Sequence, residues 1–233
     1  MKIVNTWKII IAATVSSSLL FFIAPSFAVK SAPEYRKLGL SYRNQGQHEK
    51  AIDVMQKSVE LEPDNVNGLV NLGWTQHLAG KEKDAIISLW QAIYIDPFFV
   101  PSYNALGIVY LVDSQLITAL LIHTIAAVLK PDNEIAFYNL SLTLHRLKAY
   151  DLAIATGNYA AILEPLNPHP LVSSAISYWD FNRKSTAKQL YRKAIKLDIR
   201  YKTPSFLHHL RKAAFTKEQI DTTKQVLSST LEQ

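Results

Sequence analysis

Four prolines at a constant spacing constrain this chain more than any other feature of its sequence. Pro63, Pro97, Pro131 and Pro165 recur at equal intervals. A fixed period of roughly 20 to 50 residues indicates stacked supersecondary units, and an interval of about 34 residues accommodates two helices with their two turns. Because proline cannot continue a helix and restricts the residue before it, each proline is expected to end the second helix of a unit. The spacing therefore predicts an all-α solenoid.

The residues between the prolines repeat one pattern of small and bulky side chains. With proline as position 32, the units are 32–65, 66–99, 100–133, 134–167 and 168–201, and the last unit has Ile199 in place of proline. Position 20 is always alanine, at Ala51, Ala85, Ala119, Ala153 and Ala187, and positions 8 and 27 are always small. Small residues allow two antiparallel helices to approach closely. Glycine at position 15 of the first two units, Gly46 and Gly80, suits the turn between the helices. The pattern predicts about five 34-residue helix-turn-helix repeats.

This arrangement resembles the tetratricopeptide repeat, whose signature is the same set of small and bulky positions. The resemblance covers about 32–201 and implies an α-solenoid whose first helices line a concave groove. Carried onto this sequence, it implies a groove that contains Arg36, Leu40, Arg43, Val70, Trp74, His77, Asn104, Ile108, Tyr138, Leu142, His145, Ile176 and Trp179. The middle of this surface is apolar and aromatic, which suits an extended apolar segment or an amphipathic helix of a protein partner. Alternatively, Trp74 and Trp179 cover the solenoid interior or pack against the C-terminal helices.

Chaperone-binding members of the family hold a terminal carboxylate with basic or asparagine residues at five fixed positions. Arg36 and Asn71 fit two of these positions, but Leu40, Pro101 and Ala105 occupy the other three. Three donors of a charge-assisted network are therefore missing, and we do not expect a cochaperone.

The segment 1–28 differs from the rest of the chain. Lys2 and Lys8 precede the uncharged run 9–24, and Ser26-Phe27-Ala28 offers small residues at the two positions that a signal peptidase reads. The pattern favours a cleaved signal peptide over 1–28 and an exported protein of the periplasm or an equivalent lumenal or extracellular compartment. The alternative is an uncleaved membrane anchor, because this segment approaches the ~20 residues that a membrane helix needs.

The segment 202–233 lacks the small-residue signature and is expected to cap the stack, because an ordinary repeat would leave its apolar stacking face in water. Thr203 before Pro204 predicts a helix over 204–213. Thr216 followed by Gln219 predicts a capping box for a last helix that reaches about Leu231.

The C-terminal end is also basic. Residues 183–233 contain 12 basic and 4 acidic residues, whereas 29–182 contain 11 basic and 15 acidic ones. Such an end suits an anionic membrane, an acidic partner or a polyanionic polymer, and the alternative is a solvated terminal helix pair. Nucleic acid is not expected as a partner, because no recognition motif accompanies the charge.

The third repeat is unusually apolar. Between Pro97 and Lys130 the only other charge is Asp113, and the second helix carries Leu120, Leu121 and Ile122 where solvated residues are usual. A helix that is apolar all round is buried or forms an interface. The sequence thus leaves two alternatives open, which are self-association or partner binding through this repeat and mutual burial within a short solenoid.

Catalytic and cofactor motifs are not found in the sequence. The seven histidines are scattered, there is no cysteine, and no serine lies in a nucleophile-elbow motif. We therefore expect no enzyme, no metal and no cofactor. The preferred function is an exported scaffold or assembly factor that binds a peptide or helix in its groove. One alternative is a structural protein that an uncleaved N-terminal helix tethers to the membrane, and another is a noncatalytic subunit of an envelope enzyme complex.

Overall fold

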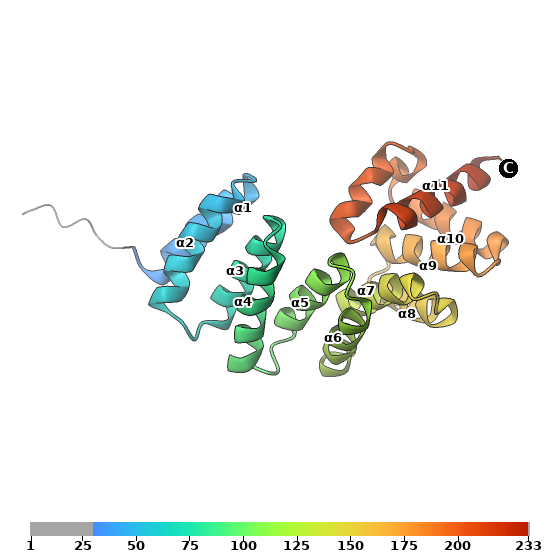
Figure 1. Ribbon diagram of the computed structural model, residues 1–233. Helices are drawn as coiled ribbons and strands as arrows, with labels where there is room; N and C mark the ends of the chain where they lie inside the picture. The colour runs from blue at the N-terminus through green and yellow to red at the C-terminus, as the bar shows by residue number, and fades with distance from the viewer. Residues whose placement is uncertain (1–29, 233) are drawn as a thin grey trace, which may run out of the picture. The chain divides into compact units, whose positions relative to one another are not determined.

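The structure is a computed structural model that describes residues 30–232. The predicted signal peptide, 1–28, lies outside the described residues. From Ser31 onward the chain forms one compact unit of eleven α-helices and two 3₁₀ helices (Figure 1). The first helices of the repeats are α1 (Ala32–Asn44), α3 (Val66–Leu78), α5 (Val100–Val112), α7 (Glu134–Arg146) and α9 (Pro168–Asp180). The second helices are α2 (His48–Leu61), α4 (Glu82–Ile95), α6 (Leu116–Leu129), α8 (Tyr150–Leu163) and α10 (Lys184–Leu197). The all-α fold of paired helices is confirmed.

The helix boundaries follow the sequence period. Each first helix has 13 residues, each second helix has 14, and each begins one full period after its counterpart in the preceding repeat. The second helices of the first four repeats end just before the repeated prolines, with one residue between helix and proline. This intervening residue leaves the helical region, as Glu62 does with φ −136° and ψ 75°, because proline disfavours the α conformation before it. Asp198 adopts a similar conformation before Ile199, so α10 ends at the equivalent place without a proline.

The small residues lie where the two helices of a pair meet. All five alanines at position 20 are fully buried, and so are all five residues at position 27, which are Ser58, Ala92, Ala126, Ala160 and Ala194. The Ser58 hydroxyl donates to the Ala32 carbonyl at 2.8 Å, so this polar member of the set is satisfied. Each first helix also packs against the first helix of the next repeat, and one continuous core runs from Ala85 to Leu227.

The turns within the repeats share one backbone conformation. Position 15 has a positive φ in all five repeats, at Gly46, Gly80, Ser114, Lys148 and Asn182. Glycine reaches this left-handed region freely, whereas other residues adopt it at a cost of about 1 kcal/mol or more. The predicted turn at the two glycines is therefore a property of every repeat.

The C-terminal segment differs in part from its prediction. Two 3₁₀ helices follow α10, η1 (Ile199–Lys202) and η2 (Phe206–Ala213), and α11 (Lys217–Leu231) ends the fold. The predicted helix over 204–213 is wrong in type, since the segment is 3₁₀, and in its cap, since Ser205 precedes it instead of Thr203. The predicted capping box is confirmed, because Thr216 and Gln219 bond to each other's backbone amides at 3.3 and 3.0 Å.

Candidate partner-binding face

Part of the predicted groove is accessible on the first helices of the first three repeats. We call this set the open strip; it consists of the partly exposed residues Leu40, Arg43, Val70, Trp74, His77 and Ile108. Val70 and Trp74 pack against the core on one side and present their other side to solvent. The open strip is therefore an apolar centre with polar residues at its edges, which is the composition that binds an amphipathic helix.

Neighbouring side chains hold the polar residues of the strip in place. His77 Nδ1 lies 2.7 Å from Glu82 Oε2, so this nitrogen carries the proton and donates to the carboxylate. The His77 ring lies 5.1 Å from the Trp74 ring, which fixes the indole from one side. Arg43 donates to Asn71 Oδ1 at 3.4 Å, and burial lowers the pKa of its guanidinium from the usual range, although arginine stays charged at physiological pH.

Two predicted groove residues are occupied by contacts within the protein. Arg36 donates to Glu62 Oε2 at 2.7 Å and to Ser58 Oγ at 3.1 Å, and only 18% of its side chain is exposed. Asn104 and Asn133 exchange two amide hydrogen bonds of 3.3 and 2.8 Å, which join α5 to the N-cap of α7. Both residues therefore link adjacent elements of the stack rather than standing free for a partner.

The C-terminal half of the predicted groove is covered by the protein itself. Tyr138, Leu142, His145 and Ile176 are all buried. The Tyr138 hydroxyl donates to the Ala213 carbonyl at the end of η2, and Phe215 packs 6.3 Å from its ring. Trp179 stays partly exposed, with Lys184 Nζ 4.8 Å from its ring centroid. The C-terminal segment therefore packs on this face at Tyr138, Leu142 and His145. The sequence offers such packing as an alternative only for Trp74 and Trp179.

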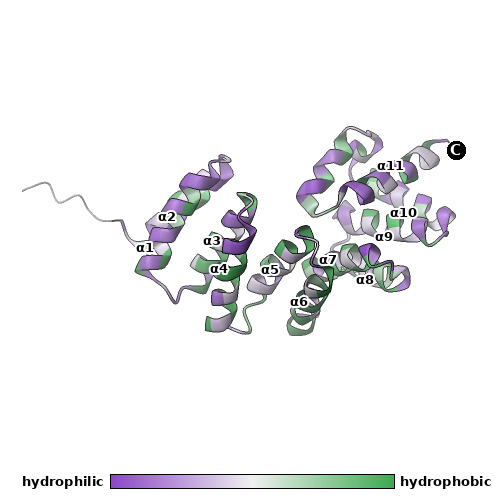
Figure 2. Ribbon diagram, in the orientation of Figure 1, coloured by the Kyte–Doolittle hydropathy of each residue, from purple (hydrophilic) through white to green (hydrophobic). Residues whose placement is uncertain are grey.

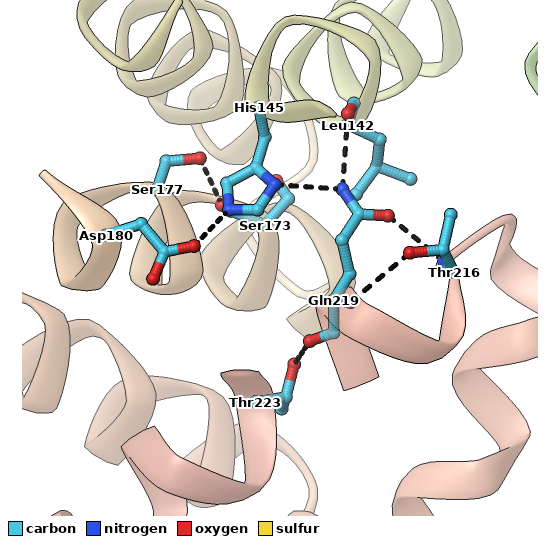
Figure 3. A network of polar contacts seen from close by, with 8 residues as sticks. All are labelled: Leu142, His145, Ser173, Ser177, Asp180, Thr216, Gln219 and Thr223. Carbon is cyan, nitrogen blue, oxygen red and sulfur yellow. Dashed lines mark hydrogen bonds and ion pairs between the residues drawn. The ribbon is translucent and has the colours of Figure 1, made fainter. Parts of the chain in front are cut away.

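A buried polar network joins α11 to this face (Figure 3). Gln219 Nε2 donates to the Leu142 carbonyl at 3.2 Å and lies 3.2 Å from His145 Nδ1. Because the amide nitrogen is a donor, His145 accepts at Nδ1 and carries its proton on Nε2, which lies 3.0 Å from Asp180 Oδ2. The Gln219 oxygen accepts from the Thr216 amide. One side chain thus caps α11 and anchors it to α7.

Substitutions of Gln219 should separate these two roles. Gln219→Glu keeps the capping acceptor but replaces the donor that meets the Leu142 carbonyl, so we expect a loss of about 1–3 kcal/mol in the free energy that keeps α11 docked. Hydrogen exchange of the α11 amides measures this free energy. Gln225→Ala, at an exposed position of the same helix, is the control and should leave exchange unchanged. Equal protection in Gln219→Glu would show that the anchor contributes nothing.

Two other titratable groups among residues 30–232 have strongly shifted pKa values. Burial, together with the neighbouring Glu164, raises the pKa of Glu134 to about 7. Burial lowers the pKa of His169 to about 4, and nearby His209 acts in the same direction. Within residues 30–232, no group of three or more acidic, histidine or cysteine side chains is placed to hold a metal ion. In the same part of the chain, no helix combines the length and the apolarity that crossing a bilayer requires.

Parts of this sequence resemble known sequences. The tetratricopeptide repeat profile matches residues 32–65. A 55-residue segment is 38% identical to the photosystem I assembly protein Ycf3 of Acaryochloris marina strain MBIC 11017, and it spans 24% of this chain and only 33% of that protein.

Solved structures share the fold at lower identity. A crystal structure of MamA has a TM-score of 0.61 and 24% identity, over 72% of this chain and 92% of that one. A thermophilic tetratricopeptide repeat protein of Thermus thermophilus has a TM-score of 0.64 and 18% identity, over 87% and 100% of the two chains. At these identities the likeness establishes the fold alone.

Proposed function

We propose that this tetratricopeptide repeat protein is a noncatalytic scaffold that holds a helical segment of a protein partner on the open strip. The observation that carries the proposal is the difference between the two halves of one face. In the C-terminal half, Tyr138, Leu142 and His145 are buried beneath the C-terminal segment. In the N-terminal half, the equivalent residues Leu40, Val70, Trp74 and Ile108 stay partly exposed.

The covered half indicates the chemistry of the partner. The internal occupant α11 is an amphipathic helix that buries Ile220, Val226 and Leu227 and satisfies its polar Gln219 on the receiving helix. A partner helix of the same kind would place apolar residues on Trp74 and an acceptor near the Arg43 guanidinium. The name of the relative from Acaryochloris marina describes an assembly protein, which supports a role in assembling a complex.

Truncation of Trp74 should remove most of the binding. A buried tryptophan at the centre of an interface typically contributes about 2 kcal/mol or more, so Trp74→Ala should weaken partner binding roughly 30-fold or more. A photocrosslinker placed at Val70 identifies the partner, and its affinity is then measured for both proteins. Trp179→Ala, outside the open strip, is the matched control and should bind normally. If both variants retain full affinity, the open strip is not the binding face.

Export is a further part of the proposal, supported by the composition of 1–28. N-terminal sequencing of the protein from cells should give a start at Val29. A start at Met1, with the protein in the membrane fraction, would support the alternative of a tethered protein whose basic end contacts anionic lipid.

A further inference from the structure

The second helices of the middle repeats expose large apolar side chains at equivalent positions. At position 29, Tyr94, Val128 and Ile162 are 88%, 73% and 73% exposed. At position 22, Ile87 and Leu121 are also exposed. We call these five residues with Tyr159 the apolar outer patch. It lies on the face of α4, α6 and α8 that points away from the alanines at position 20, and Figure 2 shows α6 as hydrophobic along most of its length.

The size of this patch exceeds what a monomer usually exposes. The helix α6 contains no charged residue from Leu116 to Leu129, and Ile117 and Ile125 extend the patch along it. Each large apolar side chain contributes roughly 100 Å², so the eight side chains together expose roughly 800 Å², against a few hundred Å² on typical monomers. A standard interface buries about 800 Å² per partner. The patch is therefore large enough for a stable protein interface. Burial within the solenoid accounts for only part of the third repeat, because Ile122 is buried whereas Leu121 is 59% exposed.

The two ends of the patch carry charges of opposite sign. On α2 the equivalent exposed positions 22, 26 and 29 are occupied by Asp53, Lys57 and Glu60, two acidic residues and one basic residue. On α10 they are occupied by Gln189, Lys193 and Lys196. Position 29 shows the progression in one series, from Glu60 through the three apolar residues to Lys196. The outer surface thus runs from an acidic edge across an apolar centre to a basic edge.

We propose that a second copy of this chain covers the apolar outer patch, in a two-fold dimer whose helix stacks run in opposite directions. A two-fold interface pairs residue i with j and j with i. With the axis along α6, each α6 packs on its partner, and each acidic α2 edge meets a basic α10 edge. Stacks that run in the same direction would instead place acidic edges together and basic edges together, which costs free energy. An anionic lipid surface fits less well, because the acidic edge would be repelled.

The acidic edge also contains a pocket that could receive a side chain from the opposite edge of a second copy. It lies between α2 and α4, has a volume of about 910 Å³, and is lined by apolar residues that include Val59, Ile87 and Trp90. At the opposite, basic edge, Ile199 is 69% exposed where the other repeats have proline. In the opposed arrangement this isoleucine lies on the edge that approaches the partner's pocket. The dimer proposal is independent of partner binding on the open strip.

The first experiment tests association through the patch. We expect the protein as isolated from cells to form a dimer by sedimentation equilibrium and Leu121→Glu to weaken association at least roughly 100-fold, because the substituted residue is buried twice at a two-fold interface. Leu78→Glu, at an exposed leucine of α3, is the matched control and should remain dimeric. A wild-type monomer, or association that persists in Leu121→Glu with its fold intact, would overturn the proposal.

Charge exchange tests the opposed orientation. Glu60→Lys and Lys196→Glu should each weaken the dimer, because each creates a like-charge pair at both ends. The double variant Glu60→Lys/Lys196→Glu should restore association, since the two edges have exchanged sign together. Double-variant association no better than that of the single variants would contradict the pairing of these edges.

Disulfide crosslinking tests the opposed orientation in cells. The chain has no cysteine, so Glu60→Cys and Lys196→Cys introduce the only thiols. On mild oxidation, co-expressed single variants should give a mixed 60–196 disulfide, and each variant alone should give none. Dominant 60–60 or 196–196 disulfides would overturn the orientation. A monomer that sediments with phosphatidylglycerol-containing phosphatidylcholine vesicles, and loses this binding in Leu121→Glu, would replace the second copy with a lipid surface.

Discussion

Gly107→Ala is expected to lower the free energy of unfolding by about 1 kcal/mol or more through overpacking, although alanine is the better helix former. A Cβ at this position would stand 2.4 Å from Cε1 and 2.6 Å from Nδ1 of His123, far inside van der Waals contact. The imidazole is rigid and fully buried, so it cannot move away without displacing its neighbours. Overpacking of this kind costs about 1–3 kcal/mol or more, and the helix preference for alanine returns about 1 kcal/mol. Urea denaturation measures the difference.

Two comparisons identify the steric cause. Gly68→Ala is the matched control, because Gly68 also lies in a first helix and its added Cβ would meet nothing closer than 3.5 Å. That substitution should stabilise the protein by up to about 1 kcal/mol. In a His123→Ala background, Gly107→Ala should cost little, which gives a coupling energy of about 1–3 kcal/mol. Equal costs in both backgrounds would mean that the clash is not the cause.

The Gly107 contact is one example of a size match between two positions of each repeat. Position 8 faces position 24 of the same repeat, so Gly39 faces Met55, Gly73 faces Leu89 and Gly107 faces His123. In the fourth repeat the sizes reverse, because position 8 is Ser141 and position 24 is Gly157, whose added Cβ would stand 2.7 Å from the Ser141 hydroxyl. The sequence predicts that position 8 is small. Only the structure shows that its size is matched to a particular opposite residue.

The sequence period predicts the features that every repeat shares. It does not predict a contact that is made only once in the fold. The helix pairs, the buried alanines and the capping box of α11 are local or periodic, and the structure confirms them. The covered half of the groove was not predicted, because it depends on Gln219 reaching Leu142, 77 residues away. A residue-by-residue family comparison assigns Tyr138 and His145 to a binding face without knowing that the C-terminal segment occupies it. For the same reason, the sequence could not decide whether the apolar residues of the third repeat are buried within the solenoid or form an interface.

His123→Leu is expected to stabilise the protein by about 1–3 kcal/mol at neutral pH, because it removes unsatisfied buried polar atoms. His123 is fully buried, and neither of its ring nitrogens has a hydrogen-bond partner among the described residues. An unsatisfied buried polar atom costs about 1–3 kcal/mol. Leucine already occupies the equivalent position in the second repeat, where Leu89 packs against Gly73, so the replacement fits the local geometry. His208→Leu, at an exposed histidine, is the control and should change the stability by less than about 0.5 kcal/mol.

The advantage of His123→Leu should widen in acid. Burial lowers the pKa of His123 to about 3, whereas histidine in an unfolded chain titrates near about 6.5. Below about pH 6.5 the unfolded wild type therefore binds a proton that the fold excludes, and the wild type loses about 1.4 kcal/mol per pH unit relative to the variant. His169 also favours unfolding in acid, and Glu134, whose pKa is raised to about 7, favours the fold there. Both groups are present in both proteins, so their effects cancel in the difference. Denaturation curves from pH 8 to pH 4 measure that difference, and a constant gap would mean that His123 is protonated within the fold.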